Sequence, residues 1–126
     1  MRERALLLAL TLLTACGDGL DGPRRETCRR ALPALAPQGA SVTVLRVAPA
    51  PGSSALRIDY RLDGRREAPP RWIACRFGMG TEIREIATER GPITGASLYL
   101  LKRYYLGTPD AATGDPARRG RPPEER

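Results

Sequence analysis

The chain has 126 residues, of which 41% are hydrophobic, so its length suits one domain with a modest hydrophobic core. Histidine is absent, which excludes catalysis by Ser-His or Cys-His pairs and acid–base chemistry by an imidazole. The formal net charge of +7 comes from arginines scattered along the chain, a distribution that argues against nucleic acid as a partner. This excess is typical either of contact with another polyanion or of an arginine-rich composition without a specific role.

The first fifteen residues have the organisation of a secretory signal. Arg2 and Arg4 form a basic start, and the apolar or near-apolar run ALLLALTLL follows from Ala5 to Leu13. A membrane-spanning helix needs about 20 such residues, so this run is too short to cross a bilayer. A buried N-terminal helix would leave both arginines unexplained and would run into Gly17-Asp18-Gly19. We therefore predict a signal peptide over residues 1–15.

The segment Leu13-Thr14-Ala15-Cys16 resembles the lipobox of bacterial lipoproteins. The resemblance implies that the Cys16 thiol receives a diacylglycerol, that the chain is cut before it, and that the new amine is acylated, for example with palmitate. Such a protein is held in the cell envelope and faces the periplasm, and Gly17 after the anchor favours the outer membrane over the inner. Residues 16–22 would form a lipidated tether. The alternative is an ordinary cleaved signal in which Cys16 has no role.

An N-terminal helix is predicted after this tether. Pro23 suits a first helical turn, and Pro33 should end or kink the regular helix because proline lacks the N–H that the helix needs. Between and beyond these prolines, apolar residues recur at the i, i+3, i+4, i+7 spacing of one helix face. These residues are Cys28, Ala31, Leu32 and Leu35.

Cys28 and Cys75 are the remaining cysteines, and an oxidising compartment favours a disulfide between them. Cys75 lies in RWIACRFG, residues 71–78, where Ile73, Cys75 and Phe77 alternate with Trp72, Ala74 and Arg76. This alternation predicts a strand with Cys75 toward the core. The bridge would close a loop of about 48 residues and contribute about 4 kcal/mol in the chain-entropy treatment. Two thiols without histidine argue against a metal site, and the absence of a CxxC motif argues against a redox pair.

Three other segments have strand patterns. Residues 41–48, SVTVLRVA, are β-branched and apolar on both sides, which predicts a central strand. Residues 55–63, ALRIDYRLD, alternate as a half-buried antiparallel strand with Arg57 and Arg61 on its outer face. Residues 82–88, EIREIAT, fit a strand or a helical turn, and we expect a strand. The fold class is therefore α+β, with a three- or four-stranded antiparallel sheet in a domain over residues 23–107.

The segment ITGASLYLLKRYYLG, residues 93–107, predicts a C-terminal helix that Thr94 caps and Gly107 ends. A helical wheel places one apolar stripe against the sheet, namely Leu98, Leu101 and Tyr105, flanked by Leu100 and Tyr104. The opposite side carries Tyr99, Lys102, Arg103 and Leu106. Residues 108–126 have no apolar periodicity and predict a disordered basic tail that contains Arg118, Arg119 and Arg121.

No catalytic motif of the GxSxG, P-loop or GxGxxG type is present, so we expect a non-enzymatic domain without a cofactor or metal. The ending ERGPITGASLYLLKRYYL resembles the close of small uncharacterised proteobacterial envelope proteins, and the organisation is broadly like that of small accessory lipoproteins. Neither resemblance implies an activity. We expect an interaction domain that binds an envelope protein. The alternatives are a binding module for an anionic lipid or glycan, and an accessory subunit of a membrane transporter. The candidate contacts to a partner or anion are Arg57, Arg61, Arg76, Tyr99, Lys102 and Arg103.

Overall fold

The computed structural model describes residues 21–37, 40–50, 54–64 and 69–118. One helix precedes five strands, and short helical segments follow them. The elements are α1 (Asp21–Leu35), β1 (Val42–Pro49), β2 (Leu56–Leu62), β3 (Arg71–Phe77), β4 (Ile83–Thr88), β5 (Gly91–Ile93), α2 (Gly95–Leu101), the π-helix η1 (Lys102–Leu106), α3 (Pro109–Thr113) and the 3₁₀-helix η2 (Pro116–Arg118). The predicted α+β class is confirmed.

The strands form one antiparallel sheet in the order β1-β2-β3-β4-β5. The sheet has five strands rather than three or four, because the short β5 pairs with β4 through Gly91, Pro92 and Ile93. Three residues that include a proline carry too little strand pattern to be recognised from sequence. A proline is acceptable there because β5 is an edge strand, where one row of backbone groups needs no partner. The expectation of a strand over residues 82–88 is confirmed by β4.

The prediction of a central strand over residues 41–48 was wrong, because β1 forms an edge of the sheet. Its register shifts between Val44 and Arg46, so Leu45 is the extra residue of a β-bulge and is half exposed. Val44 pairs with a residue of β2 on the core face, and Val47 does so again after the bulge. The bulge therefore produces the apolar pattern on both sides that resembled a central strand.

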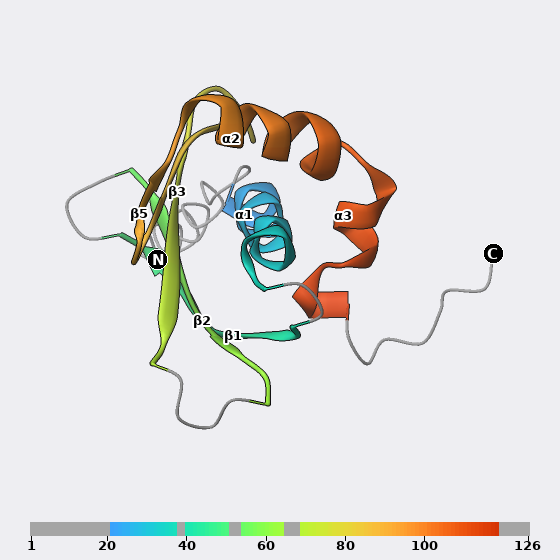
Figure 1. Cartoon of the computed structure of the whole chain (residues 1–126). Coiled ribbons are helices and arrows are strands. Elements are labelled where there is room, and N and C mark those ends of the chain that lie inside the picture. The colour runs from blue at the N-terminus through green and yellow to red at the C-terminus, as the bar shows by residue number, and fades with distance from the viewer. Residues whose placement is uncertain (1–20, 38–39, 51–53, 65–68, 119–126) are drawn as a thin grey trace, which may run out of the picture.

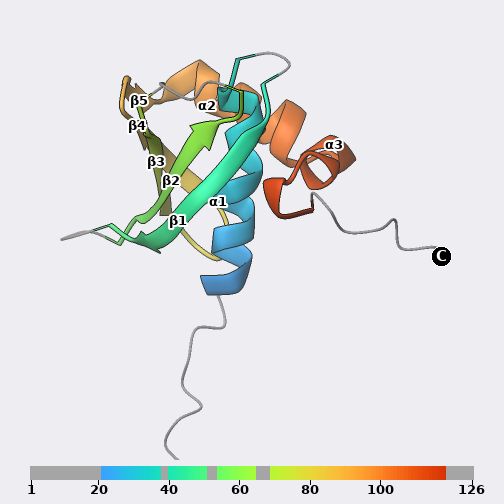
Figure 2. The ribbon, with the colours of Figure 1, turned by 90° about the horizontal axis from the view of Figure 1, so that it is seen from below.

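The helix α1 lies along one face of the sheet, and α3 lies beyond α1 on the side away from the sheet (Figures 1 and 2). The helix α1 begins at Asp21, so Asp21 and Gly22 of the predicted tether belong to the helix. Residues 16–20 lie outside the described residues. The helix α1 also continues through Pro33 to Leu35, so the expected end at Pro33 was wrong. Pro33 stands in the last turn, where the helix loses a single backbone hydrogen bond, while Leu32 and Leu35 still pack on the core.

The core lies between α1 and the sheet and contains the predicted disulfide. The Cys28–Cys75 bridge has an S–S distance of 2.10 Å and a Cα–Cα distance of 6.0 Å, and both residues are fully buried. Large aliphatic side chains from three strands surround it without solvent contact. These are Ile58, Ile73, Ile83 and Ile86. The bridge therefore joins the buried side of α1 to the buried side of β3.

The helical segment after β5 was predicted correctly in part. Leu98 and Leu101 are buried against the core, but Leu100 and Tyr104 are exposed rather than turned to the sheet. Leu106, expected on the outer side, packs on the core. The positions of Tyr104 and Leu106 follow from η1, because a π-helix turns less per residue and rotates Tyr104 outward and Leu106 inward.

Residues 108–118 are folded, so the predicted disordered tail was wrong for this stretch, whereas residues 119–126, with Arg119 and Arg121, lie outside the described residues. Asp115 is only 3% exposed and accepts hydrogen bonds from the Arg29 guanidinium at 2.6 Å and 3.0 Å. The backbone N–H of Ala117 donates a third hydrogen bond at 3.0 Å. These contacts bind the segment to α1, although the sequence here has no apolar periodicity.

Candidate functional site

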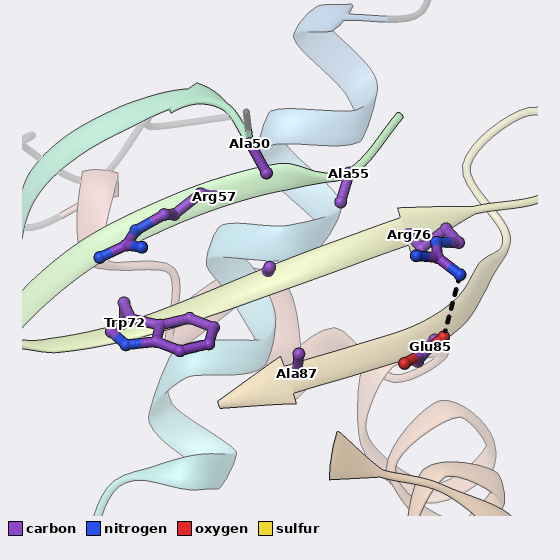
Figure 3. A pocket seen from close by; sticks show the side chains of 8 residues that line it. Ala50, Ala55, Arg57, Trp72, Arg76, Glu85 and Ala87 are labelled. Carbon is purple, nitrogen blue, oxygen red and sulfur yellow. Dashed lines mark hydrogen bonds and ion pairs between the residues drawn. The ribbon is translucent and has the colours of Figure 1, made fainter. Parts of the chain in front are cut away.

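The face of the sheet opposite α1 is the candidate site, because every described helix lies on the other side (Figure 1). Antiparallel pairing brings the outward-facing residues of β2, β3 and β4 side by side across this face. Arg57 stands opposite Ala74, which stands opposite Ala87, and Arg76 stands opposite Glu85. We call this surface the open face and define it by the residues of Figure 3, namely Ala50, Ala55, Arg57, Trp72, Ala74, Arg76, Glu85 and Ala87, together with Asp59 of β2.

Trp72 and Arg57 form a stacked pair at one end of the open face. Trp72 is the only tryptophan of the chain and lies directly opposite Asp59 on β2. The Arg57 guanidinium carbon lies 4.8 Å from the centroid of the indole ring, within the range of a cation–π contact. Asp59 holds the same guanidinium, with its Oδ1 at 3.0 Å from Nε and 2.9 Å from Nη2. The indole is therefore a half-buried aromatic platform against which Arg57 and Asp59 are ordered.

Arg76 and Glu85 form the other end of the open face. They are direct cross-strand neighbours on β3 and β4, and Arg76 Nη1 lies 3.3 Å from Glu85 Oε2 (Figure 3). Both side chains are largely exposed, at 53% and 41%. An exposed pair of this kind stabilises the domain by less than about 1 kcal/mol. The two side chains therefore present paired opposite charges to solvent at this end of the face.

Between these two pairs, alanines leave the sheet backbone close to the surface. Ala74 and Ala87 come from the paired strands β3 and β4, and the backbone N–H of Ala50 donates to the carbonyl of Ala55 at 2.8 Å where the chain enters β2. With the neighbouring charged and aromatic side chains they line a shallow cavity of about 310 Å³. A volume of this size accepts one or two inserted side chains and is at the low end for a small-molecule site.

The charges of the open face cancel. Arg57 and Arg76 contribute +2, Asp59 and Glu85 contribute −2, and both arginines are ion-paired within the face. An anion-binding groove instead presents an excess of unpaired positive charge. The open face therefore combines an aromatic platform, arginines and a small apolar floor without a net field.

The residues predicted as partner contacts fall into separate regions. Arg57 and Arg76 belong to the open face, whereas Arg61 stands further along β2, opposite Thr43, and is exposed. Tyr99, Lys102 and Arg103 lie on α2 and η1, and Lys102 Nζ lies 3.5 Å from Glu82 Oε1. Cys16 lies outside the described residues.

Trp72 and the alanines Ala74 and Ala87 were not among the predicted contacts. The sequence carried a signal for Trp72 and Ala74, because the alternation that turns Ile73 and Cys75 inward turns Trp72 and Ala74 outward. A lone outward-facing tryptophan indicates a contact surface as strongly as the charges do. The pairing of Ala74 with Ala87 in one floor had no signal, because it arises from cross-strand register that the sequence does not specify.

Comparison with known proteins adds no assignment: no family model, curated protein or solved structure matches this chain. Within the described residues, none of the helices has both the length and the apolar character required to cross a bilayer. The same part of the chain contains no group of three or more metal-ligating side chains.

Proposed function

We propose that the chain is a lipid-anchored envelope protein whose domain binds a partner protein through the open face and catalyses no reaction. The proposed binding is supported by the Trp72–Arg57 pair, which lies beside an alanine floor on a sheet face that no described helix covers. Tryptophan and arginine dominate the binding energy of protein interfaces when they flank a pocket that excludes water. The alanine floor supplies that pocket for a side chain of the partner.

The charge balance favours a protein over an anionic lipid or glycan. Both arginines of the open face already have carboxylate partners, Asp59 and Glu85, at hydrogen-bonding distances. A polyanion would have to displace these carboxylates and would meet their negative charge. Binding to a polyanion would also fall steeply between low and moderate salt, whereas a docked protein interface persists.

The anchoring half of the proposal rests on the lipobox-like segment that ends at Cys16. One acyl chain binds a membrane only marginally, and two or three chains hold a protein there stably. The tether and anchor would place the open face within the envelope, where an oxidising compartment also accounts for the Cys28–Cys75 bridge.

Cys16→Ala should release the protein from the membrane fraction, because it removes the atom that carries the lipid. The measurement is sedimentation of membranes together with the intact mass of the purified wild type, which should include the lipid. Arg90→Ala, an exposed change in the β4–β5 turn, is the matched control and should stay with the membranes. A Cys16→Ala protein that still sediments, together with a wild type that carries no lipid mass, would refute the anchoring.

A further inference from the structure

The first turn of α1 and the β3–β4 turn, Gly78–Glu82, lie side by side at one end of the sheet. Arg24, in the first turn of α1, donates from Nε to the carbonyl of Gly80 at 2.8 Å and from Nη2 to the carbonyl of Gly78 at 3.3 Å. Its guanidinium carbon also lies 5.3 Å from the centroid of the Phe77 ring. The start of the folded domain is therefore fixed to this turn.

The β3–β4 turn holds a methionine out into solvent. Gly78 N–H donates to the Glu82 carbonyl at 2.8 Å, and Glu82 N–H donates to the Met79 carbonyl at 3.2 Å. Gly80 has φ +60°, a conformation that favours glycine. Met79 is 85% exposed, more than any other large apolar side chain of the described residues. A closed turn thus presents a flexible thioether side chain to solvent.

Basic side chains lie at the β3–β4 turn that carries Met79. The Arg84 side chain lies over Gly78 so closely that a Cβ at Gly78 would collide with it. Arg24 donates to the carbonyls of this turn, and Lys102 Nζ lies 3.5 Å from Glu82 Oε1. These three positive groups and the carboxylate of Glu82 give the turn a net charge of +2. An apolar tip within a basic rim is the arrangement that binds an anionic membrane interface.

The length of the tether determines which end of the domain can reach the membrane. Asp21, the first residue of α1, follows Cys16 by five residues, and an extended chain spans at most about 3.6 Å per residue. A lipid on Cys16 would therefore hold the start of α1 within about 18 Å of the membrane. Because Arg24 fixes the β3–β4 turn to that start, Met79 is held near the same surface.

We propose that this end of the domain, with Met79 at its tip and Arg84 and Lys102 at its rim, contacts the anionic phospholipid surface of the anchoring membrane. The inference rests on the proposed lipidation of Cys16. Since β3 ends at this turn, the strands would stand up from the bilayer, with β3 rising about 23 Å. The open face would then be turned sideways, within reach of a partner in the same membrane.

The test places an environment-sensitive fluorophore at position 79 of the full-length, membrane-anchored protein. Met79→Cys can be labelled selectively, because Cys28 and Cys75 are bridged and the proposed lipid occupies Cys16. The matched control is Arg90→Cys, an exposed position in the turn at the opposite end of the strands. The proteins are placed in vesicles of phosphatidylethanolamine and phosphatidylglycerol that contain spin-labelled lipid as a quencher.

The label at position 79 should be quenched several-fold more than the label at position 90, and its emission should shift to shorter wavelength. Arg84→Glu combined with Lys102→Glu should reduce this quenching, since it reverses the charge of the rim. Equal, weak quenching at both positions in protein whose mass includes the lipid would overturn the membrane contact alone. Absence of the lipid mass would overturn both the contact and the anchoring on which it rests.

Discussion

Replacing both Cys28 and Cys75 by alanine should lower the free energy of unfolding by about 4 kcal/mol, the value expected for a bridge of this loop length. The two cysteines are 47 residues apart in sequence and fully buried. Their replacement therefore removes a restriction on the unfolded chain and leaves the surface of the folded domain unchanged. A domain of this size is stable by about 5–15 kcal/mol in total, so the loss is a large fraction of that value. The melting temperature should fall by about 20 °C.

The measurement is denaturant unfolding of the double variant beside the wild type under oxidising and reducing conditions. Reduced wild type should unfold close to the double variant, because both lack the cross-link and keep small side chains in the core. Thiol counting on the denatured, unreduced wild type should find neither Cys28 nor Cys75 free. Two titratable thiols from these positions, or a loss below about 1 kcal/mol, would show that the bridge does not hold α1 to the sheet.

Asp115→Ala should destabilise the domain by about 3 kcal/mol, because it leaves the Arg29 guanidinium partly buried without its carboxylate. Arg29 is 23% exposed and Asp115 3% exposed, and Arg30 Nε lies 3.5 Å from the same carboxylate. Asp110→Ala is the matched control: it removes an exposed carboxylate from the neighbouring α3 and should cost less than about 0.5 kcal/mol. Equal small losses in both variants would mean that residues 108–118 do not brace α1.

The contribution of Asp115 should depend on pH in one direction. Burial raises the pKa of this carboxyl, but hydrogen bonds from Arg29 and the Ala117 N–H outweigh that effect and hold the pKa below its ordinary value of 3.8. A lowered folded-state pKa gives stability that is fully present above the unfolded pKa and is lost as pH falls through the folded pKa. The difference between wild type and Asp115→Ala should therefore be constant near neutrality and shrink below about pH 4.

Local pattern was sufficient for the elements whose side chains alternate or repeat regularly. Leu56, Ile58, Tyr60 and Leu62 share one face of β2, and the same pattern placed Cys75 in the core, so the disulfide followed from compartment and orientation. The part that could not be predicted depends on contacts between distant residues. Asp115 and Arg29 are 86 residues apart, and no local periodicity around Asp115 indicates that it is buried.

Two of the other errors share a cause, because each comes from a local irregularity that changes which side chains face inward. The bulge at Leu45 gave an edge strand the pattern of a central one, and η1 turned Tyr104 outward. At the candidate site the charges were visible in sequence, but their pairing depends on register. Arg76 meets Glu85 only because β3 and β4 pair as they do.

The central claim, that the open face binds a partner protein, is tested most directly by photo-crosslinking in native membranes. A photoreactive phenylalanine derivative is placed at Trp72 on the open face or at Tyr104, an exposed aromatic on η1 of the helical side. The Trp72 position should give a discrete protein adduct that persists at moderate salt, disappears when Ala74→Gln fills the floor, and is absent from the Tyr104 position. The claim would be contradicted if the Trp72 position gave no adduct or if only the Tyr104 position gave one. It would also be contradicted if the Trp72 adduct survived Ala74→Gln or vanished at moderate salt.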